Sequence, residues 1–301
     1  MNCVICAIAR YEDTYLYEWA SYHIGLGFKH IYLYDNNDLG SNSVSTIFSG
    51  SAIESNITVI NVQGRRHCQK EVYNECYHQF PFDWCAFIDI DEFITLDNNY
   101  SEIQQFIFDK SQFDAIHLNW LCYGDNGHCA SSYEPVVQRF KKPIRPFDFK
   151  YSYIDKAENS HIKSLIKKGL DIDWAYDSDD FNSNPHTPYG LIKICNAIGE
   201  PVGNTPFSTI CLNGGYIRHY TTKTIQEYQS KIKRQCADCD ATFYSTAKFF
   251  RINSITPSKV QWMKHNEVSF SLLQICRERL RFLTLNYRLP IRFLFRSLRN
   301  K

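Results

Sequence analysis

Short apolar runs alternate with segments of helical periodicity along the first third of the chain. The apolar runs predict buried strands at residues 4–9, 30–34, 57–62 and 84–88. Apolar and aromatic side chains that recur every three or four positions predict helices over residues 14–26, 43–49 and 70–80. Strands that alternate with helices are typical of an α/β domain whose sheet is largely parallel.

The pattern changes after residue 93. A helix is predicted over residues 101–109, a strand over 115–118, a glycine-containing loop over 120–128 and a helix over 224–234. Residues 131–215 are polar and poor in strand signals. We interpret residues 1–265 as one domain and residues 266–301 as a tail.

Polar clusters follow each of the four predicted strands. They lie at residues 10–13, 35–37, 64–66 and 89–91. In parallel sheets ligands bind at the carboxyl ends of the strands, so four separate segments point to one site.

Asp89 and Asp91 come directly after the fourth apolar run and are separated by one residue. In an extended strand end, residues i and i+2 face the same side, so the two carboxylates are expected to project together. A divalent cation would relieve their repulsion, and oxygen ligands suit Mg²⁺ or Mn²⁺, which usually bridge to diphosphate oxygens. The alternative is a strand end followed by two solvated acids.

Four stretches of the sequence, taken together, resemble glycosyltransferase family 92 and its bacterial family-2-like relatives. They comprise residues 17–23 with 26–28 and 32–36, residues 69–74 with 87–93, residues 119–128 with 138–140, and residues 219–223 with 227–234. Their order and spacing cover residues 3 to about 240.

The resemblance implies a GT-A fold, in which helices flank a Rossmann-like, nucleotide-sugar-binding mixed sheet. It also implies a UDP-sugar donor, first of all UDP-galactose, a Mn²⁺ or Mg²⁺ cofactor, and inversion at the anomeric carbon. Asp89 and Asp91 would be the metal-bridging pair, with Asp91 as the direct ligand. His219 would be a third metal ligand or a diphosphate partner, against the alternative of a structural histidine in a strand.

Further donor-binding residues are expected from the same resemblance and from their positions at strand ends. Asp35 would lie near the base or ribose, and Glu12 is retained where the family usually has Lys-Asn-Glu. The remaining candidates are Arg66, Gln69, Lys223 and Lys231, whose donors suit a diphosphate; the two lysines could equally be solvated helix-face charges.

Sugar transfer needs a base that deprotonates the acceptor hydroxyl. Asp125 lies in the glycine-containing loop and Glu92 follows the aspartate pair, so both are candidates. Glu134, His128 and His186 are left as open alternatives. Trp120 could stack on a sugar face or belong to the core.

Charge and composition change this picture at one end of the chain. The 301 residues carry a net charge of +1, which argues against a nucleic-acid binder. Residues 276–301 hold eight basic residues against one acidic residue. Apolar and basic side chains alternate there, and Pro290 predicts two short helices. This pattern is typical of helices that bind an anionic membrane surface, although a helix packed on the body is the alternative.

Twelve cysteines are scattered along the chain, with two Cys-x-x-Cys pairs at Cys3/Cys6 and Cys236/Cys239. A zinc site would require both pairs to meet, whereas Cys3 and Cys6 lie in an apolar strand run. No charged leader precedes this run and no apolar stretch of 18 residues occurs. We therefore expect reduced thiols in a cytoplasmic protein that is peripheral at the inner face of the membrane.

These observations predict a metal-dependent, inverting glycosyltransferase. It would transfer a sugar, for which galactose is the first candidate, from a UDP-sugar to a saccharide acceptor. The acceptor could be lipid-linked, in surface polysaccharide or glycan synthesis. The alternatives are a metal-dependent phosphodiesterase or nucleotidyltransferase, and a non-catalytic sugar- or membrane-binding module.

Overall fold

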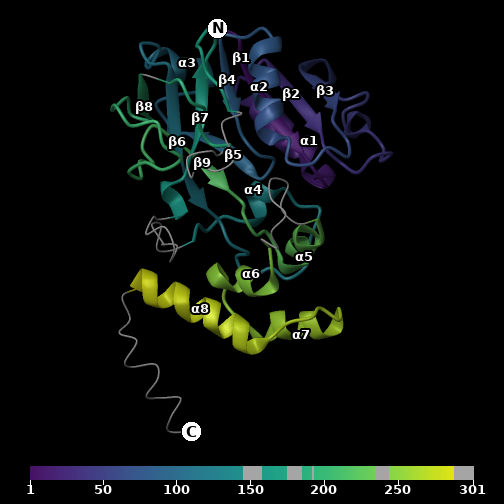
Figure 1. Cartoon of the computed structure of the whole chain (residues 1–301). Helices are drawn as coiled ribbons and strands as arrows, with labels where there is room; N and C mark the ends of the chain where they lie inside the picture. Colours follow the sequence, from purple (N-terminus) through teal and green to yellow (C-terminus); the bar gives the residue numbers. More distant parts are fainter. Residues whose placement is uncertain (145–157, 175–184, 192, 235–243, 288–301) are drawn as a thin grey trace. The chain divides into compact units, whose positions relative to one another are not determined.

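The computed structural model describes residues 1–144, 158–174, 185–191, 193–234 and 244–287 (Figure 1). These residues form two compact units. The sheet unit contains residues 1–121 and 160–219, and the helical unit contains residues 122–159 and, of the later residues described, 220–234 and 244–287. Residues 122–159 and 220–234 group with the C-terminal helices. The boundaries of the two units therefore differ from the predicted division after residue 265.

The first half of the sheet unit has the predicted alternation of strands and helices. Its elements are β1 (Cys3–Ala9), α1 (Asp13–Gly25), β2 (His30–Asp35), β3 (Ile57–Asn61), α2 (Gln69–Gln79) and β4 (Trp84–Phe87). The segment predicted as a helix at 43–49 contains a short 3₁₀ helix, Val44–Ile47, and a second one follows at Glu54–Asn56. The four strands are parallel, in the order β3-β2-β1-β4.

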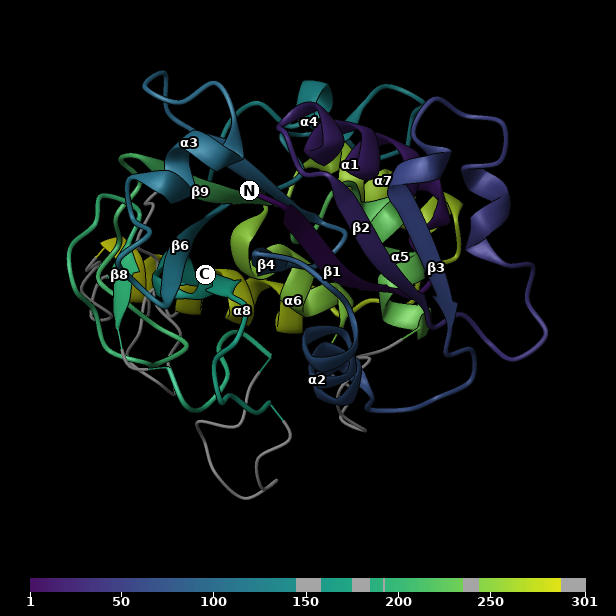
Figure 2. The same ribbon diagram turned by 90° about the horizontal axis from the view of Figure 1, so that it is seen from above.

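The helices α1 and α2 cover opposite faces of these parallel strands (Figure 2). One face of α2 presents Val72, Tyr73, Cys76 and Tyr77 to a core that includes Cys6 of β1. The apolar face of each helix and the alternate side chains of the strands therefore build the core, as their periodicities require.

The second half of the sheet unit is antiparallel or mixed. It comprises β5 (Glu92–Leu96), α3 (Ile103–Phe108), β6 (Ala115–Cys122), β7 (Ile162–Lys167), β8 (Ile194–Asn196) and β9 (Gly215–His219). Among the described residues the strand order is β3-β2-β1-β4-β7-β6-β9-β5, with β8 beside β6. Two predictions were wrong here. The strand predicted at 115–118 continues through Cys122 into the predicted loop, and the segment 131–215 contributes two strands to the sheet.

Helix α1 is tied to strand β5 by three polar side chains. The Trp19 Nε1–H donates to the Glu92 carbonyl at 2.8 Å, and the Tyr22 hydroxyl donates to the Ile94 carbonyl at 2.8 Å. His23 donates from Nδ1 to the Trp19 carbonyl and accepts the Ile94 N–H at Nε2. Burial lowers the pKa of His23 to about 3, so its ring is neutral in this arrangement. The aromatic motif of α1 therefore fixes the strand that begins at Glu92.

The helical unit contains α4 (Val136–Arg139), α5 (Ile225–Arg234), α6 (Thr246–Ile252), α7 (Pro257–His265) and α8 (Leu272–Tyr287), with a short 3₁₀ helix at Glu158–Ser160. Its apolar core is formed by Ile225, Tyr228, Phe249, Phe250, Met263 and Ile275. The buried Arg139 guanidinium pairs with both carboxylate oxygens of Glu227, at 3.2 and 2.8 Å. This bidentate pair links α4 to the first turn of α5.

The predicted tail begins within this unit. Helix α8 runs unbroken to Tyr287, and the predicted break at Pro290 and the basic residues from 288 to 301 lie outside the described residues. Cys236 and Cys239 also lie outside them. No helix in the described part of the chain has the length and apolar character needed to cross a membrane.

Candidate active site

The polar loops that follow β1, β2 and β3 are joined at the carboxyl edge of the parallel strands. The Tyr11 N–H donates to Asn37 Oδ1 at 2.7 Å. The Asn36 side-chain amide donates to the carbonyl oxygens of Val62 and Arg65, at 3.0 and 2.9 Å. The expected convergence of these segments is therefore confirmed, and the loop after β4 lies at the same edge of the sheet.

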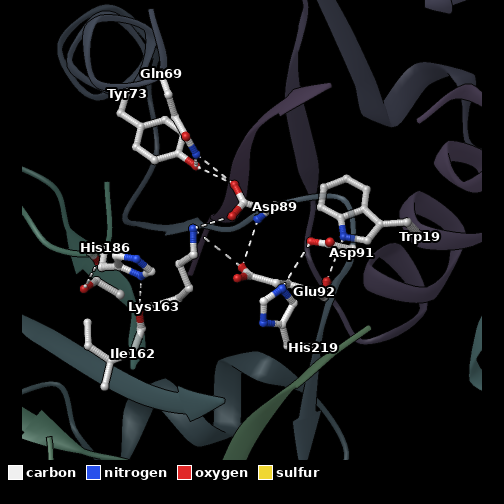
Figure 3. Close-up of polar contacts among 11 residues, drawn as sticks. Trp19, Gln69, Tyr73, Asp89, Asp91, Glu92, Ile162, Lys163, His186 and His219 are labelled. Atoms are coloured by element: carbon white, nitrogen blue, oxygen red, sulfur yellow. Dashed lines mark hydrogen bonds and ion pairs between the residues drawn. The ribbon is translucent and has the colours of Figure 1, made fainter. Parts of the chain in front are cut away.

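The loop after β4 is a tight turn. The Glu92 N–H donates to the Asp89 carbonyl at 3.1 Å, and β5 begins at Glu92. Asp89 and Asp91 are therefore not on one face of an extended strand end, as the spacing predicted, because the chain reverses at Ile90. Figure 3 shows the two carboxylates directed to different partners.

Asp89 is held by two donors from distant elements. Its Oδ1 accepts the Gln69 Nε2–H at 2.8 Å, from the first residue of α2. Its Oδ2 accepts from the Lys163 ammonium, also at 2.8 Å, from β7. The Asp89 side chain is still 35% exposed. Asp89 thus keeps an open edge while both of its oxygens are anchored.

Glu92 lies behind the turn and is fully buried. Its Oε2 accepts the Asp89 backbone N–H at 3.0 Å and lies 3.7 Å from the Lys163 ammonium. Burial raises the pKa of the Glu92 carboxyl well above its usual value, against the opposing effect of Lys163. Burial acts to lower the pKa of Lys163, but Asp89 and Glu92 outweigh it and raise that pKa. A side chain with no exposure cannot contact an acceptor, so Glu92 supports the turn from within.

Asp91 lies against a different partner, His219. Its Oδ1 is 3.7 Å from His219 Nε2, and both side chains are at least nine-tenths buried. Strands β5 and β9 are antiparallel, with Glu92 opposite His219, and this register brings the end of β9 to the turn. His219 therefore lies beside Asp91, and its role as a metal ligand or diphosphate partner stays a prediction.

The predicted trio of metal ligands is not assembled as such. Within the described ranges, no group of three or more His, Cys, Asp or Glu side chains is arranged to hold a metal ion. Asp91 and His219 nevertheless fit such an ion as a pair. Two ligands at right angles on one ion, each at about 2.1 Å, lie about 3 Å apart. The 3.7 Å between Asp91 Oδ1 and His219 Nε2 is wider, so the pair would close slightly around an ion. Mg²⁺ and similar ions commonly take one or two protein ligands and fill the other positions with phosphate oxygens and water.

The sequence profile of Glycosyltransferase family 92 matches residues 2–183, more than half of the chain. The chain belongs to glycosyltransferase family 92. A family 92 protein of Oryza sativa subsp. japonica is 26% identical in an alignment 184 residues long, which covers 54% of this chain and 30% of that protein. The chain thus spans less than a third of the length of that curated relative.

Solved structures that the chain matches in part include S. aureus TarS 1–349 in complex with UDP-GlcNAc, with a TM-score of 0.44 and 11% identity. That match covers 95% of this chain and 82% of TarS 1–349. HddC from Yersinia pseudotuberculosis has a TM-score of 0.31 and 13% identity, and the match covers 73% and 77% of the two chains. The predicted α/β class and its mixed sheet with flanking helices are confirmed, and the GT-A assignment follows from family membership.

Trp120 and the imidazole rings around it form an aromatic group beside the turn. Trp120 packs between two imidazole rings, His161 at 4.6 Å and His219 at 4.1 Å between ring centroids. With His161 stacked on it, the indole belongs to the core and supports His219; the sugar-stacking alternative is not favoured. His186 also belongs to this aromatic group, and its Nδ1 lies 2.8 Å from the Ile162 carbonyl oxygen.

The donor-binding candidates of the sheet unit differ in their surroundings. Gln69 is beside Asp89, as described above. Asp35 is buried and accepts from the Asn37 and Val44 N–H groups and from the Gln63 amide, so it orders the loops after β2 and β3. Glu12 is buried at the start of α1, and Arg66 is exposed before α2. Donor binding by these three residues stays a prediction.

The remaining candidates belong to the helical unit. Asp125 forms a buried ion pair with Lys259 and accepts the Gly127 N–H at 3.0 Å, which favours a structural role over that of a base. Lys231 donates to the Thr221 carbonyl at 3.2 Å and lies over the Tyr244 ring. Lys223 is buried in a left-handed backbone conformation, with φ of 51°. His128 and Glu134 are exposed.

Lys163 is the site residue that sequence reasoning missed. It lies in β7, within a segment that was interpreted as strand-poor. The signal that could have found it is a lysine between apolar residues, Ile162 and Leu165, in a short strand-like run. A lysine inside a buried strand requires a buried anionic partner.

Proposed function

We propose that this chain is a metal-dependent, inverting glycosyltransferase. It transfers a sugar, for which galactose is the first candidate, from a UDP-sugar to a saccharide acceptor. The observation that carries the proposal is the Asp91–His219 pair beside the anchored Asp89 in a chain of family 92. Carboxylate and imidazole side chains at the carboxyl edge of a parallel sheet suit a metal-bound diphosphate.

The proposed reaction is a single displacement. The acceptor hydroxyl oxygen forms a bond with the anomeric carbon as the bond from that carbon to the UDP oxygen breaks, which inverts the configuration. The hydroxyl proton goes to a base, and UDP leaves as the anion. Asp91 and His219 would hold Mn²⁺ or Mg²⁺, whose charge offsets the charge that develops on the departing diphosphate.

The residues of the turn have defined parts in this proposal. Asp91 and His219 orient the ion, and Trp120 packs against the His219 ring and limits its movement. Asp89 offers its exposed edge to a hydrogen-bond donor of the nucleotide sugar. Glu92 stays buried and holds the backbone of the turn through the Asp89 N–H. Glu92, Lys163 and His219 lie on three strands of one sheet, which hold these side chains in place before a ligand binds.

We extend the proposal to the acceptor and its location. Helix α8 exposes Leu272 and Leu273, at 52% and 63%, ahead of a basic segment of the chain. This combination supports contact with an anionic membrane surface and a lipid-linked saccharide acceptor. The protein would then act at the inner face of the membrane as a peripheral protein.

The test is hydrolysis of UDP-galactose, UDP-glucose, UDP-GlcNAc and UDP-GalNAc in the presence of Mn²⁺, with and without saccharide acceptors. We expect UDP release from one donor, abolished by a chelator and by Asp91→Asn but retained by Asp109→Asn, an exposed matched control. Release of UMP would support the phosphodiesterase alternative. Failure of all four donors to bind in calorimetry would overturn the UDP-sugar proposal.

A further inference from the structure

Lys163, from strand β7 in the antiparallel half of the sheet, contacts Asp89, whereas Asp91 faces His219. The Lys163 side chain is 1% exposed, and its ammonium lies 2.8 Å from Asp89 Oδ2 and 3.7 Å from Glu92 Oε2. Figure 3 shows it between these two carboxylates, on the Asp89 side of the turn. Asp91 Oδ1 instead faces His219.

This arrangement occupies the oxygens of Asp89 with cationic and amide donors. Oδ2 accepts from Lys163 and Oδ1 accepts from Gln69, both at 2.8 Å. A metal ion that used either oxygen would have to approach a carboxylate whose charge is already balanced by a buried ammonium. Like charges a few ångströms apart repel, and the Lys163 ammonium is buried and therefore little screened by water.

The lysine cannot easily leave this position. The Glu92 carboxylate approaches it from the protein interior, and the Glu92 Oε2 also accepts the Asp89 N–H. Withdrawal of Lys163 would leave the buried Glu92 side chain and the partly exposed Asp89 carboxylate without their cationic partner, which is costly. The ion pair is therefore a fixed part of the turn.

We propose that Lys163 is a positioning residue that keeps Asp89 out of metal coordination and leaves the divalent cation to Asp91 and His219. The inference rests on the proposed function in so far as the cation is the one that carries the donor diphosphate. The resemblance already implied Asp91 as the direct ligand, and the inference adds the contact through which Lys163 keeps Asp89 from the same task. Asp89 is a fixed hydrogen-bond acceptor with an exposed edge, and Asp91 is the ligand.

The test is a titration of the full chain with Mn²⁺ alone, without nucleotide, in which electron paramagnetic resonance measures the free ion. The key variant is Lys163→Met with Glu92→Gln, which removes the buried ammonium together with the buried carboxyl group behind it and leaves the Asp89 carboxylate without a cationic partner. The amide introduced by Glu92→Gln retains an oxygen that can accept the Asp89 N–H. Lys163→Arg is the matched control that keeps the positive charge.

We expect the double variant to bind Mn²⁺ at least tenfold more tightly than the wild type, because Asp89 can join Asp91 and His219. Adding Asp89→Asn to the double variant should abolish this gain. In the wild-type background, Asp89→Asn should change the Mn²⁺ affinity less than twofold, Asp91→Asn should weaken it at least tenfold, and Lys163→Arg should match the wild type.

Two results would overturn the inference. One is that Asp89→Asn and Asp91→Asn, each made in the wild-type chain, weaken Mn²⁺ binding equally. The other is a folded double variant, checked by circular dichroism, that binds Mn²⁺ no better than the wild type. Because no donor is present, these results are separate from the fate of the proposed function, which fails only if no nucleotide sugar binds or reacts.

Discussion

Two lysines of this chain, one in each compact unit, form buried ion pairs with aspartates, and the two pairs differ in one respect. Lys163 and Lys259 have side chains that are each 1% exposed. The partner of Lys163, Asp89, is 35% exposed, whereas the partner of Lys259, Asp125, is 6% exposed. The first pair retains an open carboxylate edge for a ligand, and the second is enclosed. Within these two lysine pairs, an open carboxylate edge is therefore present at Asp89 and absent at Asp125.

The largest expected effect is on the enclosed pair. Lys259→Met leaves the buried Asp125 carboxylate without its cation, and breaking such a pair costs about 3–5 kcal/mol of unfolding free energy. Urea denaturation of the wild type and the variant would measure this loss. The double variant Lys259→Met with Asp125→Asn should recover most of it. Donor hydrolysis per folded molecule should change less than threefold, and a loss above 100-fold would show that Asp125 acts in catalysis.

The open site should respond in the opposite way. Asp91→Asn removes one of the two proposed metal ligands, and a metal ion contributes several kcal/mol of transition-state stabilisation. We expect donor hydrolysis to fall at least about 100-fold, while the urea midpoint stays near that of the wild type. Steady-state kinetics and denaturation of the same sample measure both. A large loss of stability with little loss of activity would place Asp91 among the structural aspartates.

Acid should destabilise the sheet unit through its buried histidines. Burial lowers the pKa of His23 and of His117 to about 3, whereas an unfolded histidine titrates near 6.5. Their contribution is complete above pH 6.5 and is lost as the pH falls from 6.5 toward 3, because the unfolded chain then binds the additional protons.

Between pH 7.5 and 5.5 each histidine accounts for a loss of about 1.4 kcal/mol of unfolding free energy. Urea denaturation at both pH values measures it. His23→Gln should reduce the loss of unfolding free energy between pH 7.5 and pH 5.5 by about 1.4 kcal/mol, even if the variant is less stable at both pH values. An unchanged difference would contradict the neutral, buried state of His23.

The smallest effect is expected at an exposed cation of the same loop edge. Arg66 is exposed before α2, and exposed charges contribute about 0–1 kcal/mol. Arg66→Ala should therefore raise the KM for the donor less than about fivefold and leave kcat unchanged. A larger increase would support the donor-binding role expected of Arg66 from the sequence.

The parallel half of the sheet could be predicted from the sequence because each of its strands is an apolar run and because periodic helices follow β1 and β3. The antiparallel half could not be predicted in the same way. Strand β7 contains Lys163 at a buried position, and β8 has only three residues, so neither has a clear apolar pattern. Long connections separate these strands from their partners in the sheet, and local patterns do not report such distant pairings.

The candidate site could be predicted only in part for a related reason. Asp89, Asp91, Gln69 and His219 were expected near one another, and the structure brings them to one turn. The separation of the two aspartates depends on a turn that begins β5 and on Lys163, which lies 74 residues from Asp89 in the sequence. Neither the turn nor a contact over that distance is encoded in the Asp-x-Asp spacing.

The most direct test of the central claim is a calorimetric titration of the wild type and of His219→Gln with UDP, in Mn²⁺ and in chelator. The claim is that Asp91 and His219 bind a divalent ion that carries a nucleotide diphosphate. It predicts that UDP binds the wild type in Mn²⁺ and that chelator and His219→Gln each weaken binding at least tenfold. Binding that is unaffected by both changes, or no binding in Mn²⁺, would contradict it.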